Sequence, residues 1–371
     1  MSTASHQGSF VRAASRGVLV GVVACLVAAC TASPPASGAP PPAASAGSSS
    51  TASSAGGEPS GSAAIVRLSL ASSESSISPE AAAIDFFAAE VARRSGGTIA
   101  VRAAIESGDS DQNNIARVTS GELTMAMVAA RAWDDLGVTS LQALESPFLI
   151  TTHGLAVAAT KDDLADKLLS GLTGRGVRGL ALWPIDLRHP LSFGKPFLSP
   201  AHMKGATIRF VGSSITENVI RALGGNPVHP DEVDDAVLDG VESAFDRAYI
   251  VDRRGTYTGN VTFYPRVEVL FISERAFAGL SADQRTAVES AAIATREHVL
   301  GGILPDADQA RAYCASGGGS VALASSTQLE EFRAALSPIA TSIERDPLAR
   351  DLVAAIRALP RPAAEPAVAA C

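Results

Sequence analysis

Beyond Ala63, short apolar runs alternate with segments whose apolar residues recur at helical spacing. The first such segment begins at Ser78-Pro79, a helix-capping serine followed by proline, and ends at Gly96-Gly97. The apolar runs predict strands at Ile65–Leu70, Thr98–Ala103, Leu123–Val128, Val177–Trp183, Thr207–Val211, Val267–Ile272 and Ser320–Leu323. This alternation predicts an α/β fold with mostly parallel sheets, whose ligand sites lie at the carboxyl ends of the strands.

Longer helical patterns occupy the rest of the chain. One helix is predicted for His153–Leu172, and another from Ser281 to about Ala315. Pro305 lies inside the second pattern and is expected to split it near Leu304, because proline has no N–H and clashes with the preceding turn. Two more helices and a Pro/Ala-rich tail complete the prediction.

The N-terminus has the order of a secretory signal. Arg12 and Arg16 precede the apolar run Gly17–Ala29, which ends in small residues before Cys30. The run is too short for a bilayer-spanning helix of about 20 residues. A cysteine directly after small residues resembles a bacterial lipobox, so residues 1–30 are predicted to be a lipoprotein signal peptide with Cys30 as the lipidated residue. The alternative is an ordinary signal peptide cleaved nearby.

Residues 31–62 consist almost entirely of Ser, Ala, Gly and Pro, with Glu58 as the only charge. Such a segment buries too little apolar surface to offset its ordering entropy and is predicted to be disordered. As a flexible coil it would span roughly 30 Å, which fits a tether.

Composition and the absence of known motifs argue against several classes of function. The net charge is −8 with no basic cluster, which argues against nucleic-acid binding. The 46% hydrophobic content and 371 residues suffice for two lobes with sizeable cores. The histidines lack metal-ligand spacing, and no HExxH, GxSxG, Walker or dinucleotide motif occurs. We therefore expect no metal, no cofactor and no enzymatic activity.

Arg209 is the main candidate for chemistry. In the predicted strand Thr207–Val211 it shares a face with the two end residues, and a buried guanidinium there needs an anionic partner. The partner is either an internal carboxylate or a ligand carboxylate, which the guanidinium can bind through two parallel hydrogen bonds. Ser213 in the following turn is a second candidate, because a helix start beside Arg209 favours an anion; Ser214-x-x-Glu217 has the form of a capping box.

The order of motifs resembles that of TRAP-transporter solute-binding proteins, the DctP-like, C4-dicarboxylate-binding family. The matching residues are Lys204-Gly205, Arg209, Leu223-Gly224-Gly225-Asn226-Pro227, Glu232-Val233, Gly240-Val241-Glu242-Ser243-Ala244 and, earlier, Ser146-Pro147-Phe148-Leu149. The resemblance implies that Arg209 binds a ligand carboxylate. The loop Glu106–Asp109 departs from the family pattern, so ligand contacts from that loop are not carried over.

The resemblance implies two further ligand-binding arginines. Arg188 fits the position of a second, more variable arginine, although Asp186 could instead be its partner. Arg247 stands where many members have a ligand-binding asparagine; it is either a cationic ligand contact or a solvated surface residue.

The implied fold is α/β and two-lobed, of the type II, TRAP-type periplasmic-binding-protein class, with central mixed sheets and a long helix between the lobes. Lobe I would comprise residues 63–185 and 273–309. Lobe II would comprise residues 186–272 and 310–360, followed by a tail, 361–371.

Cys314 and Cys371 are the cysteines of the predicted mature body, since Cys25 and Cys30 belong to the signal region. Outside the cytoplasm such a pair can oxidise to a disulfide, which requires the two Cα atoms to come within bonding reach; the alternative is two free thiols.

The expected function is capture of a small carboxylate-bearing solute between the lobes and delivery to a separate membrane permease. C4-dicarboxylates, sugar acids, aromatic acids and 2-oxo acids are all open as solutes. A ligand-binding sensor subunit and a lipid-anchored enzyme are the alternatives.

Overall fold

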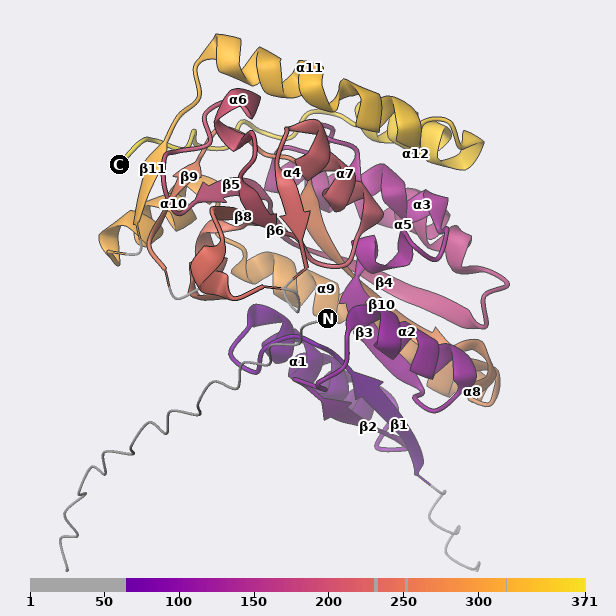
Figure 1. Ribbon diagram of the computed structural model, residues 1–371. Coiled ribbons are helices and arrows are strands. Elements are labelled where there is room, and N and C mark those ends of the chain that lie inside the picture. Colours follow the sequence, from indigo (N-terminus) through magenta and orange to yellow (C-terminus); the bar gives the residue numbers. More distant parts are fainter. Residues whose placement is uncertain (1–64, 230–232, 251–252, 318) are drawn as a thin grey trace, which may run out of the picture. The chain divides into compact units, whose positions relative to one another are not determined.

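A computed structural model describes residues 65–229, 233–250, 253–317 and 319–371 (Figure 1). The predicted signal peptide with Cys30 and the predicted tether lie outside the described residues. Within the described residues, no helix is both long enough and apolar enough to cross a membrane.

A five-stranded sheet has the order β2-β1-β3-β10-β4. Its parallel strands are β1 (Val66–Ala71), β2 (Ile99–Ala104) and β3 (Met125–Ala129). β10 (Pro265–Ser273) runs antiparallel between β3 and β4 (Val177–Leu187). The predicted strands in this part of the chain are therefore confirmed.

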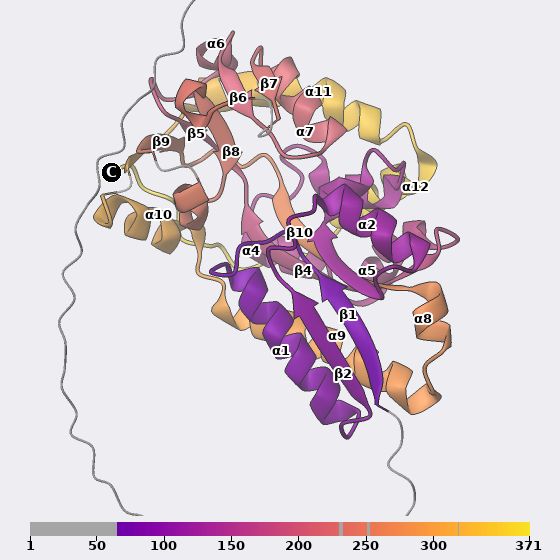
Figure 2. The same ribbon diagram turned by 60° about the horizontal axis from the view of Figure 1, so that its bottom comes forward.

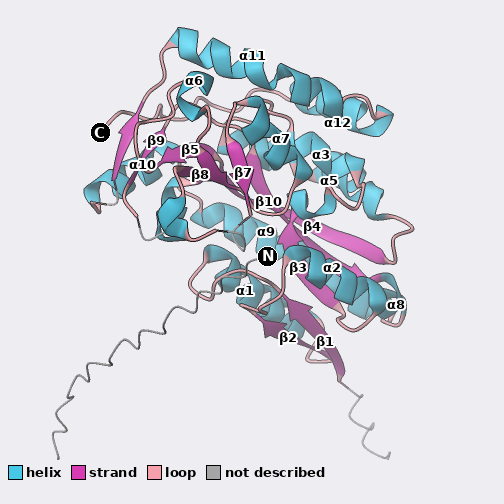
Figure 3. Cartoon of the chain, viewed as in Figure 1, coloured by secondary structure: helices cyan, strands magenta, loops and turns pink. Residues whose placement is uncertain are grey.

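A six-stranded sheet has the order β11-β9-β5-β8-β6-β7 (Figure 3). The strands are β5 (His189–Ser192), β6 (Thr207–Arg209), β7 (Asn226–Val228), β8 (Gly240–Ser243), β9 (Gly255–Thr258) and β11 (Gly319–Ala322). β6 pairs in parallel with both β7 and β8, whereas β5 is antiparallel to β8 and β9. The sequence analysis missed β5, β7 and β9, because these segments contain no apolar run like those that predicted β6 and β11.

Helices cover the sheets. They are α1 (Pro79–Arg94), α2 (Asp111–Ser120), α3 (Thr139–Gln142), α4 (His153–Ala159), α5 (Asp162–Leu169), α6 (Pro200–Met203), α7 (Ser214–Ala222), α8 (Glu274–Ala278), α9 (Ala282–Gly302), α10 (Asp306–Ala315), α11 (Ser326–Ile343) and α12 (Pro347–Arg357). Short 3₁₀ helices are η1 (Ala130–Trp133), η2 (Ala143–Glu145), η3 (Ser170–Leu172), η4 (Asp235–Val237) and η5 (Phe245–Ile250).

The five-stranded sheet is buried on both faces. In β3, Met125 and Met127 pack into one apolar cluster with side chains of α1 and α9, while Ala126 and Val128 pack into another. Side chains alternate between the faces of a strand, so a continuous apolar run indicates burial on both sides. α1 and α9 pack against each other, and side chains of both belong to the apolar cluster on one face of this sheet (Figure 2).

The structure shows whether two of the predicted helices are continuous. The split at Pro305 is confirmed, since α9 ends at Gly302 and α10 begins at Asp306. The single helix predicted for His153–Leu172 is wrong. α4 ends at Ala159 with Thr160 as its C-cap, and Lys161 is extended before α5 starts at Asp162.

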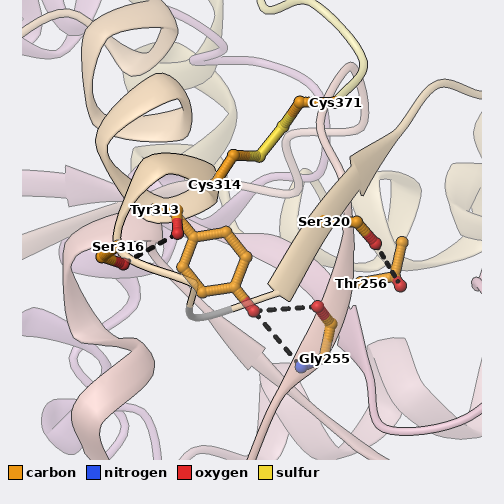
Figure 4. Close-up of a disulfide and its surroundings, with 7 residues drawn as sticks. All are labelled: Gly255, Thr256, Tyr313, Cys314, Ser316, Ser320 and Cys371. Atoms are coloured by element: carbon orange, nitrogen blue, oxygen red, sulfur yellow. Dashed lines mark hydrogen bonds between the residues drawn. A yellow bond between two sulfur atoms is a disulfide. The ribbon is translucent and has the colours of Figure 1, made fainter.

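The C-terminal tail is fixed at several points. Two carboxylate oxygens of Glu365 accept hydrogen bonds from the first backbone N–H groups of α4. Cys371 exchanges both backbone hydrogen bonds with Val321 of β11, and it forms a disulfide with Cys314 of α10, with 6.4 Å between the Cα atoms (Figure 4). The structure thus contains the bond that the sequence left open.

The lobe boundaries remain a prediction. Sheet membership places β10 with the five-stranded sheet, although the predicted boundary assigns residues 265–272 to lobe II. A division by sheets would therefore move those residues to lobe I.

Candidate functional site

A cavity of about 530 Å³ lies where the carboxyl ends of parallel strands from both sheets meet. From the five-stranded sheet it is lined by the segments that follow β1, β2 and β3, namely 73–75, 108–112 and Arg131. From the six-stranded sheet it is lined by residues at the ends of β6 and β8, including Arg209 and Glu242. This is the position in which α/β folds bind ligands.

Arg209 lies on the cavity wall as the last residue of β6. It is half-buried, and its strand neighbour Ile208 is 1% exposed on the opposite face, so the predicted facing is confirmed. Among the described residues, no carboxylate oxygen lies within 4 Å of its guanidinium, and its buried Nε has no hydrogen-bond partner. Burial lowers the pKa of Arg209, and the charges of Arg188 and Arg131 act in the same direction.

Arg188 lies in the same cavity wall, between β4 and β5, and is 4% exposed. Its Nε lies 3.1 Å from Asp186 Oδ1 and 3.6 Å from Glu242 Oε2. Burial opposes its charge, but these two carboxylates outweigh burial and raise the pKa of Arg188. The pairing with Asp186 that the sequence offered as an alternative is thus present, and Arg188 also reaches the cavity.

Arg247 is 3% exposed, so the solvated alternative is wrong. Its Nε donates to Asp186 Oδ2 at 2.5 Å, and its other nitrogens contact Glu80 of α1 and Glu74, which follows β1. Glu74 also pairs with Arg266 of β10. Burial alone would raise the pKa of Glu74, but the two arginines lower it to about 2. Arg247 therefore links η5 to the five-stranded sheet and its helix while lining the cavity.

Ser213 is buried and does not line the cavity. It is the N-cap of α7, because its hydroxyl accepts a hydrogen bond from the Thr216 N–H; the predicted role of Ser214 as the cap is wrong by one position. The Ser213 hydroxyl also lies 2.6 Å from Asp134 Oδ2 and 3.1 Å from Glu145 Oε2. Burial raises the pKa of Asp134 to about 7 and that of Glu145 well above its ordinary value.

Sequence reasoning missed Arg131, which is 9% exposed in η1 and lines the cavity. The available signal was its place two residues beyond the end of an apolar strand, where parallel sheets present ligand contacts. It also missed Arg266, which lies near the start of β10, just before the predicted strand Val267–Ile272.

Among the described residues, no group of three or more His, Cys, Asp or Glu side chains is arranged to hold a metal ion. The arrangement is instead suited to an anionic ligand, since five arginines line one cavity: Arg131, Arg188, Arg209, Arg247 and Arg266.

Comparison with known proteins gives a family match. Residues 70–230 match the model of the DctP family, described as bacterial extracellular solute-binding protein, family 7. The chain is 24% identical over 202 residues to the C4-dicarboxylate-binding periplasmic protein DctP of Rhodobacter capsulatus, a match that covers 52% of this chain and 60% of that protein. It is 27% identical over 117 residues to the 2,3-diketo-L-gulonate-binding periplasmic protein YiaO of Escherichia coli, covering 32% of this chain and 35% of that protein. The matches thus span less than two thirds of these curated relatives.

Solved structures match over more of the chain. A TRAP periplasmic solute-binding protein from Shewanella oneidensis with bound succinate has a TM-score of 0.70 at 18% identity, covering 80% of this chain and 99% of that one. A TRAP periplasmic solute-binding protein from Roseobacter denitrificans with bound β-D-glucuronate has a TM-score of 0.69 at 21% identity, covering 79% and 99%. The two-lobed α/β fold is therefore confirmed.

The family and these structures are solute-binding proteins rather than enzymes, in agreement with the expectation from the missing catalytic motifs. The matched region contains β2, β3, β4 and the strand that carries Arg209. Over residues 70–230 the chain is therefore similar to the DctP family of bacterial extracellular solute-binding proteins, family 7.

Proposed function

We propose that this chain is the solute-binding protein of a TRAP-type transporter. It binds a small carboxylate-bearing solute in the cavity between the two sheets and delivers it to a membrane permease. The observation that carries the proposal is the Arg209 guanidinium, which faces the cavity without a carboxylate partner among the described residues. A solute carboxylate supplies the missing counter-charge and two hydrogen bonds.

The cavity wall also explains how binding could be transmitted to a permease. Side chains from both sheets line it, so a bound solute makes its full set of contacts only when the two walls are close together. A ligand shifts such an equilibrium by its differential affinity for the two arrangements. The closed arrangement is then the form that a permease would recognise.

The same proposal includes location outside the cytoplasm and, at Cys30, attachment to a membrane by a lipid. The order of basic residues, apolar run, small residues and cysteine supports this location. The test is fractionation of cells that express Cys30→Ala, which should move the protein from the membrane fraction to the soluble fraction. Recovery of wild type and variant in the same fraction would contradict lipidation.

The role of Arg209 is tested by ligand binding. A thermal-shift screen against organic acids identifies a solute, because a ligand that binds the folded state raises the melting temperature. Arg209→Gln should then weaken binding of that solute by about 100-fold, or about 3 kcal/mol, since a charge-assisted pair is lost. Titration calorimetry on both proteins measures the change.

Arg221→Gln is the matched control, because Arg221 is 60% exposed on α7 and pairs with Glu217 outside the cavity. It should bind like wild type. Unchanged affinity in Arg209→Gln would show that Arg209 serves the fold rather than the solute.

A further inference from the structure

The arginines of the cavity fall into two groups. Arg188, Arg247 and Arg266 each lie within ion-pair distance of at least two carboxylates. Arg131 and Arg209 have no ion pair and no side-chain hydrogen bond with any described residue. Arg131 is supplied by the segment after β3 and Arg209 by the end of β6, so the two uncommitted cations come from different sheets.

The carboxylates that line the cavity are already held by other groups. Glu242 and Glu74 are in the ion pairs described above. Asp109 pairs with Arg117 of α2. Asp111 accepts hydrogen bonds from the Ser73 hydroxyl at 2.6 Å and from the Ala129 N–H at 3.3 Å.

Arg131 therefore lacks a close counter-ion, although it is nearly buried. The charge of Arg131 lowers the pKa values of Glu74, Asp134 and Glu145, but among the described residues no carboxylate oxygen lies within 4 Å of its guanidinium. Arg131 and Arg209 also repel each other, since the charge of Arg131 lowers the pKa of Arg209. A bound anion at each guanidinium would reduce the free-energy cost of the unpaired buried charge and of the repulsion between the two arginines.

We propose that Arg131 is a specificity-determining residue that binds a second anionic group of the solute, so that this protein selects dianions over monoanions of the same shape. This inference rests on the proposed function, in which Arg209 binds the first carboxylate. The cavity of about 530 Å³ has the size of a small-molecule site and accommodates an acid of four to six carbons. Arg188, held by Asp186 and Glu242, contributes shape and hydrogen bonds rather than an uncompensated charge.

The test compares matched acids by titration calorimetry at pH 7.5. The probes are succinate against succinamate, and galactarate against galactonate, which differ mainly in one anionic group. Wild type should bind at least one of the dianions about 10- to 100-fold more tightly than its monoanionic counterpart. Arg131→Gln should remove that preference by weakening the dianion while leaving the monoanion almost unchanged. Arg209→Gln should weaken both members of the pair.

Arg102→Gln is the matched control, because Arg102 is exposed on β2 and does not line the cavity. The wild-type comparison needs no variant, so it decides the question even if Arg131→Gln fails to fold. Equal affinity of wild type for both members of each pair, or a dianion preference that survives in folded Arg131→Gln, would overturn the role of Arg131 and leave the proposed function standing. Binding of no probe and of no other organic acid would overturn both.

Discussion

At the scale of single residues, burial decides which side chains are charged. The Ser213 hydroxyl has one proton, yet two carboxyl groups, those of Asp134 and Glu145, lie within hydrogen-bond distance of it. The hydroxyl can donate to only one of them, so the other must carry a proton to avoid an unpaired buried charge. Burial raises the pKa values of both carboxyl groups, and the hydrogen bond to the Ser213 hydroxyl opposes that shift.

The stability of Asp134→Asn relative to wild type should therefore increase as the pH rises. The pKa of Asp134 is about 7 in the folded protein, above that of an unfolded aspartate, so between these values unfolding releases a proton and wild type loses stability with rising pH. The free energy of unfolding of Asp134→Asn relative to wild type should increase by about 1 to 2 kcal/mol from pH 5 to pH 8. Urea titrations at both pH values measure it.

Asp85→Asn provides the control, because Asp85 is exposed on α1 and lies outside this pair of carboxyl groups. Its effect should not vary over this range. A difference between Asp134→Asn and wild type that stays constant from pH 5 to pH 8 would mean that Asp134 is ionised in the folded protein.

At the scale of elements, Asp306 connects α10 with β5 and α4, at the break between α9 and α10. As the first residue of α10, it accepts from His189 Nε2 of β5 at 2.9 Å and lies 3.0 Å from His153 Nε2 of α4. Burial opposes a charge on His153, but the hydrogen bond and the charge of Asp306 raise its pKa. The same histidines lower the pKa of Asp306.

Asp306→Asn should destabilise the protein more at pH 5.5 than at pH 8.5. A histidine with a raised pKa stabilises the fold fully below its unfolded pKa, and the contribution is lost as the pH rises through the folded pKa. Asparagine removes the counter-charge, so the additional loss at pH 5.5 should be about 1 to 2 kcal/mol in urea unfolding. Asp308→Asn, in the same helical turn but 38% exposed, should show no such pH dependence. An equal loss at both pH values would show that His153 is neutral in the folded protein.

At the scale of the whole molecule, the C-terminal segment connects distant parts of the chain. α11 packs on α6 and α7, and α12 packs on α3 and α5, so the two helices contact elements next to both sheets. The tail then caps α4 through Glu365 and reaches β11 and α10 at Cys371. Truncation of the tail would remove the contacts of Glu365 and Cys371 together.

Cys371→Ser should lower the free energy of unfolding by up to about 4 kcal/mol, because the disulfide closes a loop of 57 residues and restricts the unfolded chain. Denaturant unfolding with and without reductant measures the change. Reductant should destabilise wild type and leave Cys371→Ser unaffected. Equal stability of wild type in both conditions would show that the bond contributes nothing to the folded state.

Features that depend on neighbouring residues could be predicted from the sequence alone. Apolar periodicity predicted the longer strands, and Pro305 predicted the split between α9 and α10, because both are set by local backbone geometry. The alternation in Thr207–Val211 placed Arg209 and Ile208 on opposite faces. β5, β7 and β9, and the break before α5, gave no comparable local signal.

Which arginines have partners, in contrast, depends on how the whole chain folds. Arg247 pairs with Glu80, which lies 167 positions away in the chain, and no spacing rule relates such residues. Arg131 and Arg209 come to the same cavity because two sheets present the carboxyl ends of their strands to it. The charge of a buried side chain depends on everything within a few ångströms of it, so the uncommitted pair could be recognised only once the chain was folded.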